Sequence, residues 1–132
     1  MKIAVFKDTA AKAGKPVMDA FIQSLEGEDY VVCTNDKRPE VDVVVIWSVL
    51  LNMYGRKPIY DYYKNKAQII VIEVGGLIRN KTWRIGIGGI NAEADFANQD
   101  VDHVDDSRVR KLGLTLKPWR ELGGGGPIVI CL

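Results

Sequence analysis

Nearly continuous apolar runs recur along the chain and predict strands that are buried on both faces of a sheet. They fall at residues 2–7, 30–34, 42–48 and 69–74, and in the last run only Glu73 is polar. Two further runs, at residues 83–90 and 127–132, predict a fifth and a sixth strand. The absence of polar alternation favours a mostly parallel sheet over an antiparallel one, because antiparallel sheets commonly leave one face in water.

Helical periodicity separates several of these runs. Pro16 suits the first turn of a helix, and Gly27 is a suitable stop. The apolar face of this helix comprises Val17, Met18, Phe21, Ile22 and Leu25. A second helix is expected from Pro58, with Ile59, Tyr62, Tyr63 and Ala67 on one face. Residues 105–107 can cap a third, short helix that runs through Leu112 and ends at Gly113. Strands alternating with helices predict an α/β protein.

The link between the second and third strands is too short for a helical crossover. Only about nine residues separate them, whereas a helical crossover needs roughly a dozen or more. Either a bare extended segment crosses the sheet, or one of the two strands lies at an edge. We favour the bare crossover, because Asp42 starts its strand as cleanly as Lys2 starts the first.

Length and composition indicate one globular domain over residues 1–132, and charge excludes some function classes. Apolar residues make up 47% and charged residues 27%, so a disordered or fibrous chain is excluded. Eighteen basic residues face seventeen acidic ones, which does not indicate a nucleic-acid binder. No signal peptide is expected and no apolar run approaches the ~20 residues that span a membrane. Cys33 and Cys131 lie in apolar runs and suggest buried free thiols. The sequence predicts a soluble, cytoplasmic protein.

The stretch at residues 68–91 is the best candidate for a functional site. A buried strand runs into Gly75-Gly76, and open α/β sheets bind ligands at such carboxyl ends. The backbone N–H groups of the two glycines could face a ligand, although a tight turn explains them equally well. Arg79, Lys81, Arg84, Lys117 and Arg120 could hold a phosphate or an anionic sugar, and each could equally be ordinary surface. Trp47, Trp83 and Trp119 flank strand ends, where they could stack on a sugar or fill the core.

Several standard sites are not indicated. Residues 86–91 (GIGGIN) match only half of the dinucleotide fingerprint and come too late in the chain, so a turn or bulge is the simpler interpretation. His103 lies in an acidic segment whose spacing fits no zinc or calcium template. We expect no metal and no cofactor. Glu93 and Asp95 are the carboxylates best placed to act as a base.

Several segments together resemble a known group of proteins. They are Trp47-Ser48, the Gly75-Gly76 turn, Gly89-Ile90-Asn91 with Ala94-Asp95-Phe96, Pro118-Trp119-Arg120 and the closing run at residues 128–132. Over roughly residues 42–132 the chain resembles the amino-terminal half of phage- and capsule-associated glycosyltransferase-like proteins of the GT-B type. The resemblance implies a Rossmann-like three-layer sandwich with a mostly parallel sheet of about five to six strands. In such enzymes the amino-terminal domain receives the acceptor and a second α/β domain binds most of the nucleotide sugar.

Two main hypotheses follow. In the first, the chain is the acceptor-side half of a sugar-transferring enzyme, with Asp95 as base and Gly75, Gly76, Arg79, Trp83, Asn91 and Arg120 as ligand-binding residues. Catalysis by this chain alone is then doubtful, because the second domain is missing. In the second, it is a non-catalytic domain that binds a nucleotide, a partner protein or a second copy of itself. A stand-alone hydrolase that uses the acidic loop is a weaker third.

Overall fold

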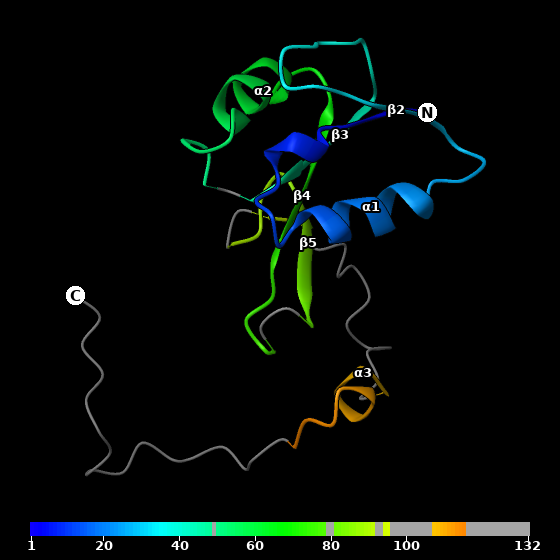
Figure 1. Ribbon diagram of the computed structural model, residues 1–132, viewed down its shortest axis with the longest axis vertical. Helices are drawn as coiled ribbons and strands as arrows, with labels where there is room; N and C mark the ends of the chain where they lie inside the picture. Colours follow the sequence, from blue (N-terminus) through cyan, green and yellow to red (C-terminus); the bar gives the residue numbers. More distant parts are fainter. Residues whose placement is uncertain (49, 79–80, 92–93, 96–106, 116–132) are drawn as a thin grey trace. The chain divides into compact units, whose positions relative to one another are not determined.

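The computed structural model describes residues 1–48, 50–78, 81–91, 94–95 and 107–115 (Figure 1). The chain divides into two compact units, Met1–Asn98 and Gln99–Leu132. The second unit contains the short helix α3 (Ser107–Lys111), followed by Gly113 with φ 65°, as the pattern predicted. The strand predicted at residues 127–132 lies outside the described residues, as do His103, Trp119 and Cys131.

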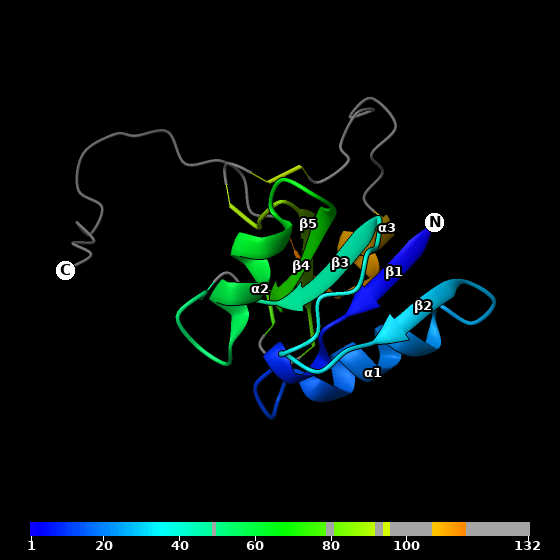
Figure 2. The ribbon, with the colours of Figure 1, turned by 90° about the horizontal axis from the view of Figure 1, so that it is seen from above.

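The first unit contains a five-stranded sheet. Its elements in chain order are β1 (Lys2–Val5), the 3-10 turn η1 (Lys7–Thr9), α1 (Lys15–Gln23), β2 (Asp29–Val32), β3 (Val43–Trp47), α2 (Arg56–Tyr63), β4 (Gln68–Val74) and β5 (Trp83–Ile87). The strands lie in the order β2-β1-β3-β4-β5 (Figure 2). The predicted α/β class is confirmed, and the helices and strands fall where the apolar patterns place them.

The sheet is parallel from β2 to β4, but β5 is antiparallel to β4. The expectation of a mostly parallel sheet therefore holds for only part of it. The physical reason lies in the loop between them. Residues 75–82 close a hairpin, in which the Gly75 N–H donates to the Thr82 carbonyl, so β5 runs back along β4.

Two apolar clusters pack on opposite faces of the sheet. Ala4, Val44, Ile46 and Val71 face α2 and pack with Ile59 and Tyr63. Ile3, Val5, Val43, Val45 and Ile72 face the other way and pack with Met18 of α1. Neighbouring strand residues thus alternate between the two clusters, as the period of two requires. One helix on each face explains why the strands carry almost no polar residues.

The link between β2 and β3 contains no helix or strand, so the predicted bare crossover is confirmed. It passes from one side of β1 to the other, because β1 pairs with both β2 and β3. The alternative expectation also holds, since β2 lies at an edge. Among the described helices, none is long and apolar enough to cross a bilayer.

Candidate functional site

Chain topology makes the carboxyl ends of β1 and β3 the expected place for a ligand. From β1 the chain passes to β2 on one side and then crosses to β3 on the other. Connections that diverge in this way leave a crevice at the carboxyl edge of a parallel sheet, and ligands commonly bind there. The segments that follow these two strands are η1 and residues 48–55, which lead into α2.

Thr9 ties the two strand ends together. Its side chain is fully buried, and its hydroxyl donates to the Phe6 carbonyl over 2.6 Å. The same oxygen accepts a hydrogen bond from the Trp47 backbone N–H at 2.9 Å. A single buried hydroxyl therefore satisfies one backbone group from the end of each strand.

Arg56 fastens residues 48–55 to the same place. Its side chain is 2% exposed, and Nε and Nη1 each donate over 2.9 Å, to the carbonyls of Thr9 and Leu50 respectively. The guanidinium also lies 4.9 Å from the centre of the Tyr54 ring. Burial lowers the pKa of Arg56, and the carboxylate of Glu73 opposes that shift. Because Nε and Nη1 donate to the protein's own carbonyls, we interpret Arg56 as a structural clamp that holds residues 48–55 against Thr9.

The backbone between β3 and α2 is strained. Ser48 has φ 69° and Tyr54 has φ 53°, and among the described residues these are the two non-glycine positions with positive φ. An L-residue in this region costs of order 1 kcal/mol or more, and such residues cluster at functional sites. Ser48 is also buried, and its hydroxyl accepts from the Leu50 N–H at 3.1 Å.

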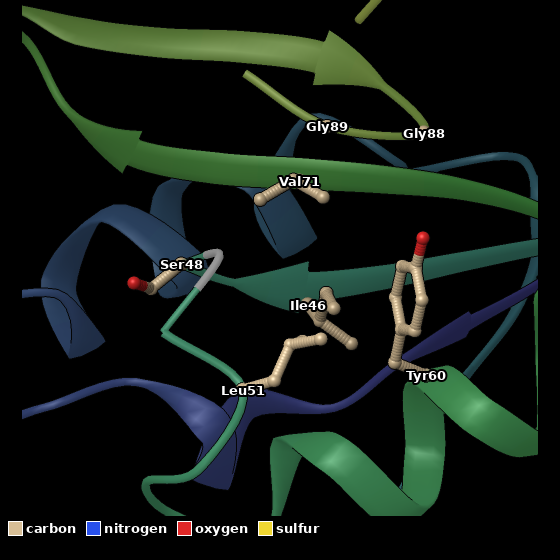
Figure 3. A pocket seen from close by; sticks show the side chains of 7 residues that line it. All are labelled: Ile46, Ser48, Leu51, Tyr60, Val71, Gly88 and Gly89. Carbon is tan, nitrogen blue, oxygen red and sulfur yellow. The ribbon is translucent and has the colours of Figure 1, made fainter. Parts of the chain in front are cut away.

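A pocket of about 140 Å³ adjoins this strained segment (Figure 3). It is lined by Ile46, Ser48, Leu51, Tyr60, Val71, Gly88 and Gly89. Figure 3 shows Ile46 and Val71 on the two neighbouring strands, and the Tyr60 hydroxyl pointing toward the Gly88–Gly89 segment. The lining therefore combines an aliphatic surface with the Tyr60 hydroxyl and the backbone of two glycines.

Two loops from distant parts of the sequence contribute to the pocket wall. Ser48 and Leu51 follow β3, whereas Gly88 and Gly89 follow β5. Gly88 has φ +75°, and its N–H donates to the Ile69 carbonyl at 2.7 Å. The chain therefore turns at Gly88, which confirms the prediction of a turn or bulge at residues 86–91. After the turn Ile90 is buried in the cluster under α2. The late glycines form a turn and also one wall of the pocket.

The predicted site residues at the β4–β5 hairpin lie together. Gly75 is buried, and its N–H donates to the Thr82 carbonyl at 2.8 Å. A Cβ on Gly75 would lie 2.6 Å from the Thr82 backbone, which explains the glycine by packing. Gly76 is exposed, with open space around it. Trp83 packs edge-on against Trp47, with ring centres 6.0 Å apart.

Asn91 and Asp95 lie at the other end of β5. Asp95 exchanges both backbone hydrogen bonds with Ile87, at 2.9 and 3.0 Å, and Ile87 pairs with Ile70 near the start of β4. Trp83 instead pairs with Val74 at the end of β4. Four residues of strand separate the two ends, or ~13 Å. The structure therefore does not bring Gly75, Gly76 and Trp83 together with Asp95, because β5 is antiparallel.

The remaining residues predicted to form a site either lie outside the described residues or are part of the core. Arg79 and Arg120 lie outside the described residues, as does Glu93. Trp47 is 4% exposed and fills the core, which was the commoner of its two expected roles. Within the described ranges no three His, Cys, Asp or Glu side chains gather where they could hold a metal ion.

Sequence reasoning missed Ser48, Tyr60 and Arg56 as site residues. Ser48 did carry a signal, since it is a polar residue directly after five buried apolar ones. Tyr60 and Arg56 carried none, because a Tyr or an Arg on a surface helix is ordinary. Only the packing of α2 on the sheet reveals them. Comparison with protein-family models, curated proteins and solved structures finds no match to this chain.

Proposed function

We propose that this chain is a glycosyltransferase-like, acceptor-side domain that binds a sugar in the pocket between α2 and the Gly88–Gly89 segment. The composition of the pocket wall carries the proposal. A sugar ring has aliphatic C–H faces and a rim of hydroxyls. Ile46, Leu51 and Val71 offer apolar contact to such a face, while Tyr60 offers a hydroxyl to the rim.

The volume of the pocket favours an acceptor sugar over a nucleotide sugar. Pockets for drug-sized ligands have volumes of roughly 300–1,000 Å³, whereas a cavity of about 150 Å³ holds a single six-membered ring such as benzene. The pocket measures about 140 Å³ and thus fits one ring. This agrees with the resemblance, which assigns the acceptor to the amino-terminal half and most of the nucleotide sugar to a second domain.

The Rossmann-like three-layer fold is part of the same proposal. The order β2-β1-β3-β4, with one helix on each face, supports a Rossmann-like three-layer sandwich that carries one antiparallel edge strand. In a two-domain arrangement the carboxyl edge would face the second α/β domain. Gly75, Gly76 and Trp83 lie at this edge and remain predicted ligand contacts there.

The test compares two tyrosines of the same helix. Tyr60→Phe removes only the hydroxyl that points into the pocket, whereas Tyr62→Phe removes a hydroxyl from an exposed ring. Titrating monosaccharides and short oligosaccharides by calorimetry should identify a ligand whose Kd rises about 3- to 10-fold in Tyr60→Phe, the worth of one neutral hydrogen bond. Tyr62→Phe should bind as the parent does. Equal losses in both variants, or no binding by any sugar, would refute the proposal.

A second candidate is sugar binding without catalysis. Among the described residues that line the pocket there is no Asp, Glu or His, the usual general bases. Asp95, the predicted base, pairs with Ile87 next to the Gly88–Gly89 wall, but it does not itself line the pocket. Incubating the protein with nucleotide sugars and the bound acceptor separates the two functions. Turnover that Asp95→Asn abolishes supports the enzyme, and binding with no turnover supports the non-catalytic domain.

A further inference from the structure

The outer edge of β2 is an unprotected strand edge. Within the described residues β2 pairs only with β1, and it stands at the end of the sheet (Figure 2). Tyr30 is 38% exposed and Val32 is 48% exposed. Their register neighbours are Ile3 and Val5, so both side chains lie on the α1 face of the sheet. Exposed apolar strand edges are templates for pairing with another chain.

Three common protective devices, namely Lys, Pro and a bulge, are missing from this edge. Proteins commonly blunt an edge strand with Lys, Pro or a bulge, and β2 (DYVV) contains neither Lys nor Pro and keeps regular register with β1 over its whole length. The opposite edge differs, because Ile87 of β5 forms a bridge with Asp95 on its outer side. Among the described residues, the β2 edge has no such bridge on its outer side.

Charges differ between the two ends of β2. The amino-terminal end carries Glu26, Glu28 and Asp29, all exposed. Beyond the carboxyl end the chain presents Lys37 and Arg38, with Asp36 beside them. Here a shallow groove of about 580 Å³ runs along Val31, Val32, Lys37, Arg38 and Pro39. A parallel neighbour would place like charges together, whereas an antiparallel neighbour with the same sequence places the acidic end against the basic end.

We propose that a second copy of this chain pairs with β2 in antiparallel orientation about a two-fold axis at Val31. In this register Tyr30 lies opposite the partner's Val32, and both stay on the α1 face. An aromatic residue opposite a β-branched one is a favourable cross-strand pair. The two five-stranded sheets would then form one continuous sheet, with Glu28 near the basic end of the partner. This interface lies on the far side of the sheet order from β4 and β5, and it does not depend on the sugar-binding proposal.

The test is sedimentation velocity of the full chain over a concentration series. The parent chain should self-associate reversibly. Val32→Lys places a charge on the pairing edge and should raise the dimer Kd about tenfold or more, which is at least ~1.4 kcal/mol. Ile85→Lys is the matched control, because Ile85 is a 53% exposed residue of the other edge strand. It should leave Kd unchanged.

A charge swap tests the orientation. Glu28→Lys and Lys37→Glu should each weaken the dimer, and the double variant should recover most of the loss, because the reversed charges again face each other. Melting curves verify that each variant folds. A parent chain that stays monomeric at the highest soluble concentration overturns the proposal. So does a dimer that Ile85→Lys dissolves and Val32→Lys does not, or a double variant whose losses simply add.

Discussion

Ser48 ends a strand of buried apolar residues with a buried hydroxyl and a φ of 69°. Alanine at this position would lose the hydrogen bond to Leu50 and keep the strain. Glycine would lose the bond and relieve the strain, because it adopts positive φ readily. We therefore expect Ser48→Gly to be more stable than Ser48→Ala by about 1 kcal/mol in urea unfolding. Equal stabilities would show that Ser48 is not strained.

A second prediction at the scale of single residues concerns Arg56. Arg56→Met leaves the Thr9 carbonyl without its donor, removes one of the two donors to the Leu50 carbonyl, and should cost about 2 kcal/mol of unfolding free energy. The neighbouring Lys57→Met serves as control. Lys57 forms an exposed ion pair with Asp61 on the same helix, so its loss should leave the unfolding free energy close to that of the parent. If the two variants unfold at the same urea concentration, Arg56 is not the clamp described above.

The residue scale also shows where sequence reasoning ends. Trp47 was predicted to lie at a strand end and it does, because a run of apolar residues has few ways to be buried. Arg56 was not predicted, because its role depends on two carbonyls, one 6 positions and the other 47 positions away in the chain. A partner 47 positions away leaves no local pattern in a sequence.

At the scale of elements, the β4–β5 hairpin distinguishes two adjacent glycines. Gly75→Ala places a Cβ 2.6 Å from the Thr82 backbone, which cannot move without breaking the hairpin. The cost should be about 2 kcal/mol or more. Gly76→Ala meets no atom within 4 Å and should stay within about 0.5 kcal/mol of the parent. Thermal unfolding measures both, and equal shifts would contradict the packing account of Gly75.

Helix α2 is tied to the bare crossover by one buried hydroxyl. The Tyr63 hydroxyl donates to the Pro39 carbonyl at 2.8 Å, and burial raises the pKa of Tyr63 above its ordinary value. This contribution to stability is present below the ordinary tyrosine pKa of about 10, and it is lost as the pH rises through the higher pKa of the folded state.

Tyr63→Phe should therefore cost about 1 kcal/mol at neutral pH, the worth of one hydrogen bond. It should also reduce the loss of stability between neutral and strongly alkaline pH. Urea unfolding across that range measures both effects, with the exposed Tyr62→Phe as control. An alkaline loss that Tyr62→Phe removes and Tyr63→Phe does not would contradict this assignment.

The positions of the elements and the parallel course of β1 to β4 were largely predictable, but the direction of β5 was not. Apolar runs located the five described strands, of which β1 and β3 are buried almost throughout because a helix covers each face of the sheet. The direction of β5 depends instead on the hairpin at residues 75–82, which apolar patterning does not reveal. That direction moved Asn91 and Asp95 away from Gly75 and Gly76, so the predicted cleft depended on the one feature that the pattern could not supply.

At the scale of the whole molecule, the first unit presents two separate surfaces. The pocket lies under α2 near the middle of the sheet, and the β2 edge lies at one end of the strand order. A dimer formed through β2 would leave the pocket of each copy accessible. Ligand binding and self-association are therefore expected to be independent, and Val32→Lys should bind sugar as the parent does.

The central claim is that the ligand site is the pocket beside residues 48–55. Amide chemical shifts of the isotope-labelled protein, followed during titration with the best-binding sugar, test it most directly. We predict the largest changes at Leu51, Gly88 and Gly89, with little change at Gly75 and Gly76. Changes centred on Gly75 and Gly76, with Gly88 and Gly89 unmoved, would contradict the account and place the site at the β4–β5 hairpin.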